Sequence, residues 1–376
     1  MKVTGFVEPT DKNNDQERVN SVTSYEQQML TKFSGPASFD HLRYVIAIAS
    51  GLAVGLMLLA RLALITAMVG MVNHTALYQL EHPNSSAEDF FPEDYVEVGE
   101  FVWTNEVQQI VISGYMITYT LPQFFTTRFA MSKGLRISVP VCLSICAASL
   151  LLTPLVAYYG WQWVLLLRLA NALGASPVLP LMIEAVEKWF PKEDKATGVA
   201  IALFSNSLVF VLTPLISGYL ASYHWTLTFY VPSGLVSVFC IIWYLIVADS
   251  PKSSRLISQR ELEKLSVSIQ HSRDKSEVSE SSTYKWYFMF KIPKFYPMTA
   301  LWMLQSITSG GFLFLIPAYL ARILKLPVDQ NGFNHFVSHI GCTMCMLWSG
   351  PATRLLQRRF DMSVSAARNI VVFCCE

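Results

Sequence analysis

The sequence predicts an all-α, multi-pass membrane protein built as a bundle of helices. Of its 376 residues, 52% are hydrophobic and only 15% are charged, so polar side chains are too few to cover the surface of a soluble fold. The apolar residues form runs long enough to cross a hydrocarbon layer of about 30 Å. The net charge of +1 provides no basic field for nucleic acid. We therefore expect a lipid bilayer as the surrounding medium and no nucleic-acid partner.

The first apolar run, residues 44–72, carries a cation, Arg61, well inside it. A guanidinium at the centre of a membrane span costs about 2.5–3.5 kcal/mol on insertion scales. We therefore expect Arg61 to face a water-filled cavity or an anion rather than lipid. The alternative is that Arg61 pairs with a neighbouring helix for a purely structural reason.

Further apolar runs follow the first, and the last of them only begins before the chain ends. They cover residues 107–125, 135–158, 163–183, 196–221, 227–247, 298–320 and 333–350, with a start at 366–375. Lys and Arg gather in the N-terminal tail and in every second connection, which predicts a cytoplasmic N-terminus. We expect a cytoplasmic tail at 1–42, a six-helix half at 43–248, a cytoplasmic loop at 249–296 and a partial second half at 297–376.

Two connections carry local signals. The polar loop 73–104 contains seven acidic residues, no Lys or Arg, and two glycosylation sequons at Asn73 and Asn84. We expect the glycan on Asn84, which lies further from the membrane edge. In the loop 249–296, Ser258 and Glu261 have the spacing of a capping box, which predicts a short amphipathic helix.

Six spans, a large cytoplasmic loop and further spans form the layout of the major facilitator superfamily. Short motifs narrow the resemblance: the stretch 61–73, Trp103-x-x-Glu106 with Tyr119 and Gln123, Pro214-Leu215-x-Ser217-Gly218, Phe229-Tyr230-x-x-x-Gly234, Asp249-Ser250-Pro251 followed by Ile257-Ser258, Pro317-x-Tyr319, Asn331-Gly332-Phe333 and Ser363-x-x-x-x-Arg368. Together they resemble the anion/cation symporter family of sialin-like, vesicular glutamate and sodium–phosphate transporters (solute carrier family 17).

That resemblance implies a major facilitator-type helical bundle rather than an enzyme. It implies secondary active transport of organic or inorganic anions by alternating access, with a sodium ion or proton as the co-transported cation. No bound cofactor is implied. The home membrane would be the plasma membrane or a lysosomal or vesicular membrane.

Arg168 in the fourth span is a second intramembrane cation. Together with Arg61 it could bind a small anionic solute, because a guanidinium matches carboxylate or phosphate in two parallel hydrogen bonds. In the family, arginines at both matching positions are linked to anion recognition. The alternative is that Arg168 extends to the headgroup layer, which Trp161 and Trp163 mark nearby.

The second span adds three candidate substrate contacts, Tyr115, Tyr119 and Gln123, spaced four residues apart on one helical face. Tyr119 and Gln123 match family positions, whereas Tyr115 does not. The alternative for both tyrosines is packing with a satisfied hydroxyl.

A metal site at His335, His339 and Cys342 is not predicted, because no carboxylate or fourth ligand lies nearby in sequence. No cluster of nucleophile, base or metal ligands predicts an enzyme.

Some positions depart from the family. Its proton-coupled members carry acidic residues and a histidine along the fourth span, where this chain has Asn171, Ala175 and Ile183. Glu184 remains, beside Lys188, where a surface ion pair is expected. Because the C-terminal half is expected to be incomplete, a second hypothesis is a non-transporting paralogue that binds or regulates a full-length partner transporter.

Overall fold

The computed structural model describes residues 41–81, 99–191, 194–254, 256–258, 261–263, 290–293, 295–301 and 303–307, with isolated positions between 319 and 359. Over these residues the chain is helical, apart from turns, irregular segments and isolated bridge residues such as the pair Val72 and Phe101. Five helices of this part are long and apolar enough to cross a membrane: Leu42–Met71, Leu135–Ala157, Trp161–Trp189, Thr197–Tyr223 and Leu227–Ile246. The predicted all-α, multi-pass fold is confirmed.

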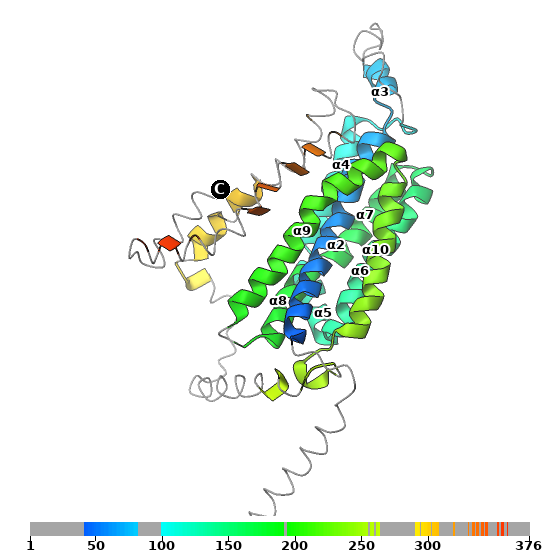
Figure 1. The fold of residues 1–376 in the computed structure, drawn as a ribbon. Helices are drawn as coiled ribbons and strands as arrows, with labels where there is room; N and C mark the ends of the chain where they lie inside the picture. Colours follow the sequence, from blue (N-terminus) through cyan, green and yellow to red (C-terminus); the bar gives the residue numbers. More distant parts are fainter. Residues whose placement is uncertain are drawn as a thin grey trace, which may run out of the picture.

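Helix α2 (Leu42–Met71) runs through the middle of the bundle and packs most extensively against α9 (Lys195–Tyr223) (Figure 1). Two glycines one turn apart allow this contact. A Cβ atom on Gly51 would clash with the carbonyl oxygen of Ala202, and one on Gly55 would lie 2.6 Å from the Cβ of Val209. Small residues at this spacing let two membrane helices approach closely.

Helices α6 (Leu135–Ala157), α7 (Trp161–Ala175) and α4 (Asn105–Thr120) pack in that order, α7 against both of the others. Helix α10 (Leu227–Ile246) covers α6 and also contacts α2. Helix α7, which carries Arg168, therefore packs between α4 and α6.

Two of the predicted spans are broken at proline. The second continues past Pro122 as α5 (Gln123–Lys133), and the fourth continues past Pro177 as α8 (Val178–Trp189). Proline lacks the N–H that would continue the helical ladder, so each helix restarts there. The hydroxyls of Thr126 and Ser176 lie 2.8 Å apart and link α5 to the break in the fourth span.

The end of the bundle at Met71 is closed by aromatic rings. Phe101 lies 5.4 Å from Trp103, 5.3 Å from Tyr158 and 5.6 Å from Trp225, measured between ring centroids. The Tyr158 hydroxyl donates to Glu100 at 2.7 Å, and Trp225 Nε1 donates to the same carboxylate at 3.4 Å. The hydrogen bond to Glu100 raises the pKa of Tyr158. These contacts hold the chain after residue 98 against the bundle.

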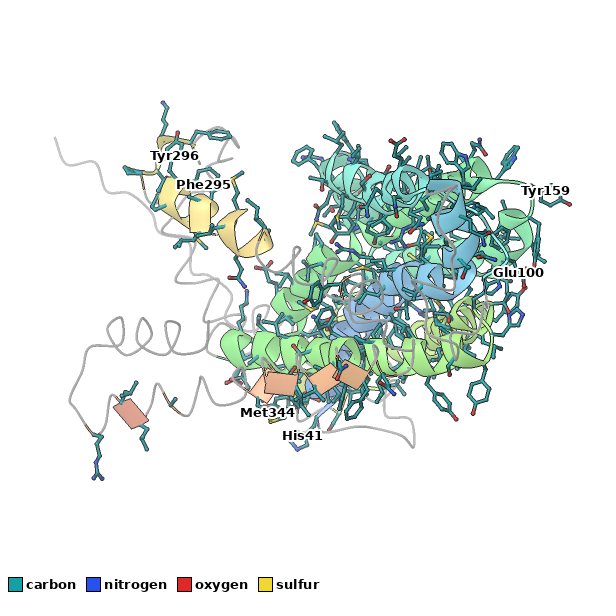
Figure 2. The ribbon with its side chains drawn as sticks, turned by 90° about the horizontal axis from the view of Figure 1, so that it is seen from above. His41, Glu100, Tyr159, Phe295, Tyr296 and Met344 are labelled. Carbon is teal, nitrogen blue, oxygen red and sulfur yellow. The ribbon has the colours of Figure 1, made fainter. Side chains whose placement is uncertain are left out.

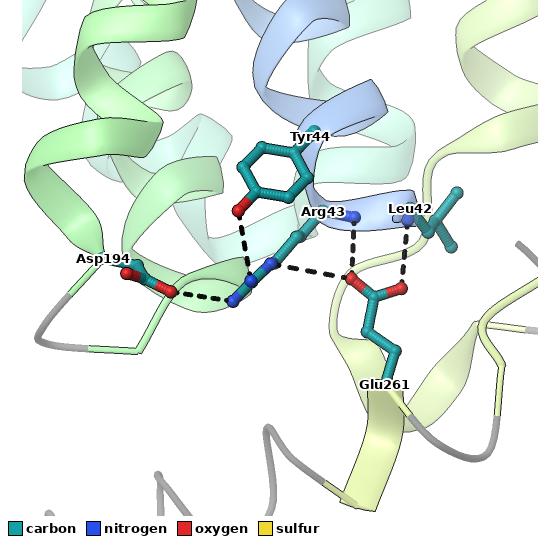
Figure 3. A network of polar contacts seen from close by, with 5 residues as sticks. All are labelled: Leu42, Arg43, Tyr44, Asp194 and Glu261. Atoms are coloured by element: carbon teal, nitrogen blue, oxygen red, sulfur yellow. Dashed lines mark hydrogen bonds and ion pairs between the residues drawn. The ribbon is translucent and has the colours of Figure 1, made fainter. Parts of the chain in front are cut away.

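The opposite end, at Leu42, is held by the polar network of Figure 3. Glu261 accepts hydrogen bonds from the backbone N–H groups of Leu42 (3.0 Å) and Arg43 (3.4 Å). The Arg43 guanidinium lies 3.8 Å from Glu261 and 3.1 Å from Asp194, and it donates to the Tyr44 hydroxyl. Glu261 thus caps the N-terminus of α2, where unpaired N–H groups favour an anion.

The short helix predicted from the capping-box spacing is described only from Glu261 onward, because residues 259 and 260 lie outside the described part of the chain. Residues 261–263 are helical, and the Leu262 N–H donates to the Ser258 carbonyl. The Glu261 carboxylate, however, is engaged by α2 rather than by its own helix.

Residues 295–301 and 303–307 are helical and lie to one side of the bundle (Figures 1 and 2), and Phe295 and Tyr296 are labelled in Figure 2. They lie within or next to the predicted span 298–320. Most of that span and of the predicted run 333–350 lies outside the described residues, as do the run 366–375, the tail 1–40 and Asn84.

Candidate functional site

Arg61 lies in the second half of α2, where its neighbours Ala60 and Ala63 are fully buried. Arg61 itself is only partly buried. Its Nη2 donates toward the sulfur of Met116 on α4, at 3.3 Å. A polarizable thioether accepts weakly, so this contact is weaker than a hydrogen bond to an oxygen acceptor.

Arg168 is more deeply placed, on α7, with 5% of its surface exposed. Within the described residues no carboxylate forms an ion pair with it, and its Nε has no hydrogen-bond partner there. The interpretation that Arg168 extends to the headgroups does not fit this burial. A buried charge without a counter-charge is costly, which makes the position suited to an anionic ligand.

Tyr115 on α4 joins the two arginines. Its ring centroid lies 5.2 Å from the Cζ of Arg61 and 4.5 Å from the Cζ of Arg168, both within cation–π range. Its side chain has no exposed surface. The adjacent Gly114 allows α4 to approach α7, because a Cβ there would lie 2.7 Å from Leu165.

Tyr119 stacks on Tyr115 with ring centroids 5.8 Å apart and an interplanar angle of 16°. It also lies 5.9 Å from Arg61 and is partly buried. Four of the five predicted contacts, Arg61, Arg168, Tyr115 and Tyr119, are therefore brought together.

Gln123 is separated from this group. It begins α5, beyond the break at Pro122, and its side chain has no hydrogen bond within the described residues. The shared helical face that was expected for Tyr119 and Gln123 assumes an unbroken helix, so the break removes the basis for grouping them.

A small pocket lies beside Arg168, with room for roughly one water molecule. Polar groups from two helices line it: Ser149 and Thr153 from α6, and Asn171 from α7. Asn171 donates to the Cys146 carbonyl at 3.2 Å, which locks α7 to α6. Ser149 and Thr153 were not predicted as site residues, although two hydroxyl residues four apart in an apolar run are visible in the sequence.

The sequence also singled out residues away from the two arginines. The ion pair between Glu184 and Lys188 is present, at 2.6 Å. Asn73 is partly buried, and its side-chain oxygen accepts from the Ala76 N–H, which caps α3 (His74–Glu81). His335, His339 and Cys342 lie outside the described residues.

Over the described residues the fold is that of a multi-pass helical membrane protein with a basic, aromatic-lined group between its helices. The chain belongs to the Major Facilitator Superfamily, whose family model matches residues 51–375. The family resemblance predicted from the sequence is confirmed by the curated relatives, which include sialins and sodium-dependent phosphate transport proteins.

Sialin from Ovis aries is 25% identical over 272 residues, which cover 72% of this chain and 54% of that protein. Sodium-dependent phosphate transport protein 1 from Oryctolagus cuniculus is 22% identical and covers 89% of this chain and 70% of that protein. Among solved structures, a bacterial homologue of the human lysosomal transporter Spinster, in an inward-facing and unoccupied conformation, aligns over 86% of this chain and 64% of its own length. Its TM-score is 0.59 at 12% identity. The chain thus spans about half of the sheep protein.

Proposed function

We propose that this protein is a secondary active transporter of organic or inorganic anions that works by alternating access. The observation that carries the proposal is the placement of two guanidiniums, Arg61 and Arg168, around one buried aromatic ring without a carboxylate paired to Arg168 in the described part of the chain. A negative solute would supply the missing counter-charge.

The exposure of the two arginines suggests an order of contact. Arg61 is partly buried and Arg168 almost fully buried, so a solute would meet Arg61 first. Tyr119, which is also partly buried and lies beside Arg61, would contact the solute from the same side. Guanidinium–carboxylate and guanidinium–phosphate pairs are bidentate and directional, which gives this site a preference for those groups.

The relatives support this class of solute, since one is named for phosphate transport. A coupled sodium ion or proton completes the proposal. Asn171 is not the proton carrier, because an amide does not titrate and its Nδ2 is held by the Cys146 carbonyl. We further propose a cytoplasmic N-terminus, a six-helix unit over 43–248 and a plasma, lysosomal or vesicular membrane.

Counterflow uptake into liposomes tests the proposal. The reconstituted protein should accumulate radiolabelled phosphate or glutamate against an internal pool of the same anion. Arg61→Ala should abolish this uptake, and Arg61→Lys should retain part of it, because lysine keeps the charge but not the bidentate geometry. Arg128→Ala, which removes an exposed arginine from α5, is the matched control and should leave uptake unchanged.

Undiminished uptake by Arg61→Ala would contradict the proposed site. A wild-type protein that transports neither anion but copurifies with a full-length relative would favour the second hypothesis, a regulatory partner.

A further inference from the structure

We infer that Tyr115 is a positioning residue whose ring, rather than its hydroxyl, fixes the two arginines for anion recognition. The inference rests on the proposed function and changes the role of Tyr115 within it. Tyr115 has no exposed surface, and its ring contacts both guanidiniums, so its contacts in this structure are with the two arginines.

The ring contacts both cations. The Arg168 Cζ lies 4.5 Å from its centroid and the Arg61 Cζ 5.2 Å from it. The negative face of an aromatic ring attracts a guanidinium, and the attraction is strongest where water is excluded. Two like charges near one site repel each other, so a ring shared between them offsets part of that repulsion and limits the positions that each guanidinium can occupy.

Packing around the ring supports this role. Tyr119 stacks on Tyr115, and Gly114 brings α4 close to α7, so the ring has little freedom to move. Arg61 contacts Tyr115, Tyr119 and Met116, all on α4. Helix α4 of the second span therefore holds the Arg61 guanidinium of the first span in place. Of these three residues of α4, Tyr115 is the one with a ring contact to Arg168.

The first measurement needs no anion. In nanodiscs containing the arginine-labelled protein, the Nε–H protons of Arg61 and Arg168 should be shifted by the ring current of Tyr115, with assignment by Arg→Lys variants. Tyr115→Leu should abolish the shift of Arg168 and reduce that of Arg61, to which the Tyr119 ring also contributes, and Tyr115→Phe should retain both shifts. An Arg168 shift that persists in Tyr115→Leu would overturn the inferred ring placement.

The second measurement is the concentration dependence of anion counterflow. Tyr115→Leu should raise the KM for phosphate or glutamate about tenfold, equivalent to about 1.4 kcal/mol, with a smaller change in maximal rate. Tyr115→Phe should restore the wild-type KM. Tyr219→Leu, at an exposed tyrosine on α9, is the matched control for loss of a tyrosine ring.

A KM that rises equally in Tyr115→Phe would show that the hydroxyl acts, and an unchanged KM in Tyr115→Leu would show that the ring has no role. Either result overturns the inference while the proposed function stands. A different result is a wild-type protein that takes up no anion although both ring-current shifts are present. In that case the ring placement is confirmed, but the proposed function fails, and the inferred role of Tyr115 in anion recognition fails with it.

Discussion

Replacing Arg168 by methionine should stabilise the protein while removing its response to anions. Arg168 is 5% exposed and has no ion-pair partner among the described residues. A guanidinium at the centre of a span costs about 2.5–3.5 kcal/mol, which is an upper limit for Arg168 because it lies in the first third of the span Trp161–Trp189. A desolvated cation–π contact such as that with Tyr115 returns about 2 kcal/mol. Methionine keeps much of the length without the charge, so the difference predicts a gain of up to about 1 kcal/mol.

Thermal unfolding in detergent micelles measures this effect. A gain of about 1 kcal/mol should raise the Tm by about 2–4 °C for a unit of this size. Wild-type protein should in addition be stabilised by phosphate or glutamate, by about 2.7 kcal/mol at a concentration 100 times the Kd. Arg168→Met should lose that stabilisation, whereas Arg128→Met, at an exposed position, should show neither effect. A destabilised Arg168→Met variant that keeps the full anion-dependent shift would refute the reasoning.

Two further predictions concern the packing that holds the site. Gly51→Val should prevent α2 from packing against α9, because its Cβ would clash with the Ala202 carbonyl oxygen. Gly234→Ala should be tolerated, since no described atom lies within 4 Å of the added Cβ. Folded yield after size-exclusion chromatography compares the two variants, and equal yields would contradict the packing. Glu261→Ala should cost about 1–3 kcal/mol, because it leaves the N–H groups of Leu42 and Arg43 without their buried acceptor. Asp194→Ala should cost less, because Asp194 is 45% exposed. The Tm losses should follow the same order, and a reversed order would contradict the network.

The spans were predictable because a long apolar run admits few structures, and helices α2, α6, α9 and α10 begin and end within a few residues of the runs. The breaks at Pro122 and Pro177 were not predicted, although both prolines are visible in the sequence. Proline alone does not determine a break in a membrane helix, where neighbouring groups satisfy the freed carbonyl. Four other prolines lie inside unbroken helices of the same bundle: Pro140, Pro154, Pro214 and Pro232.

The candidate site was predictable only in part. A charged residue inside an apolar run is conspicuous, so the sequence indicated Arg61 and Arg168 individually. That Tyr115 would lie beside both depends on how α4 packs against α2 and α7, which a one-dimensional pattern does not specify. For the same reason the contact of Glu261 with the start of α2, 219 residues away, was not predicted.

The central claim is that the cation at position 61 faces an aqueous vestibule that negative solutes can enter. Cysteine labelling tests it most directly: in a cysteine-free background, Arg61→Cys should react with a membrane-impermeant, anionic methanethiosulfonate, and excess transported anion should slow the reaction. Ile145→Cys, at an exposed apolar position on α6, should stay unreactive. An Arg61→Cys variant that is inert to the reagent from both sides of the membrane would contradict the account.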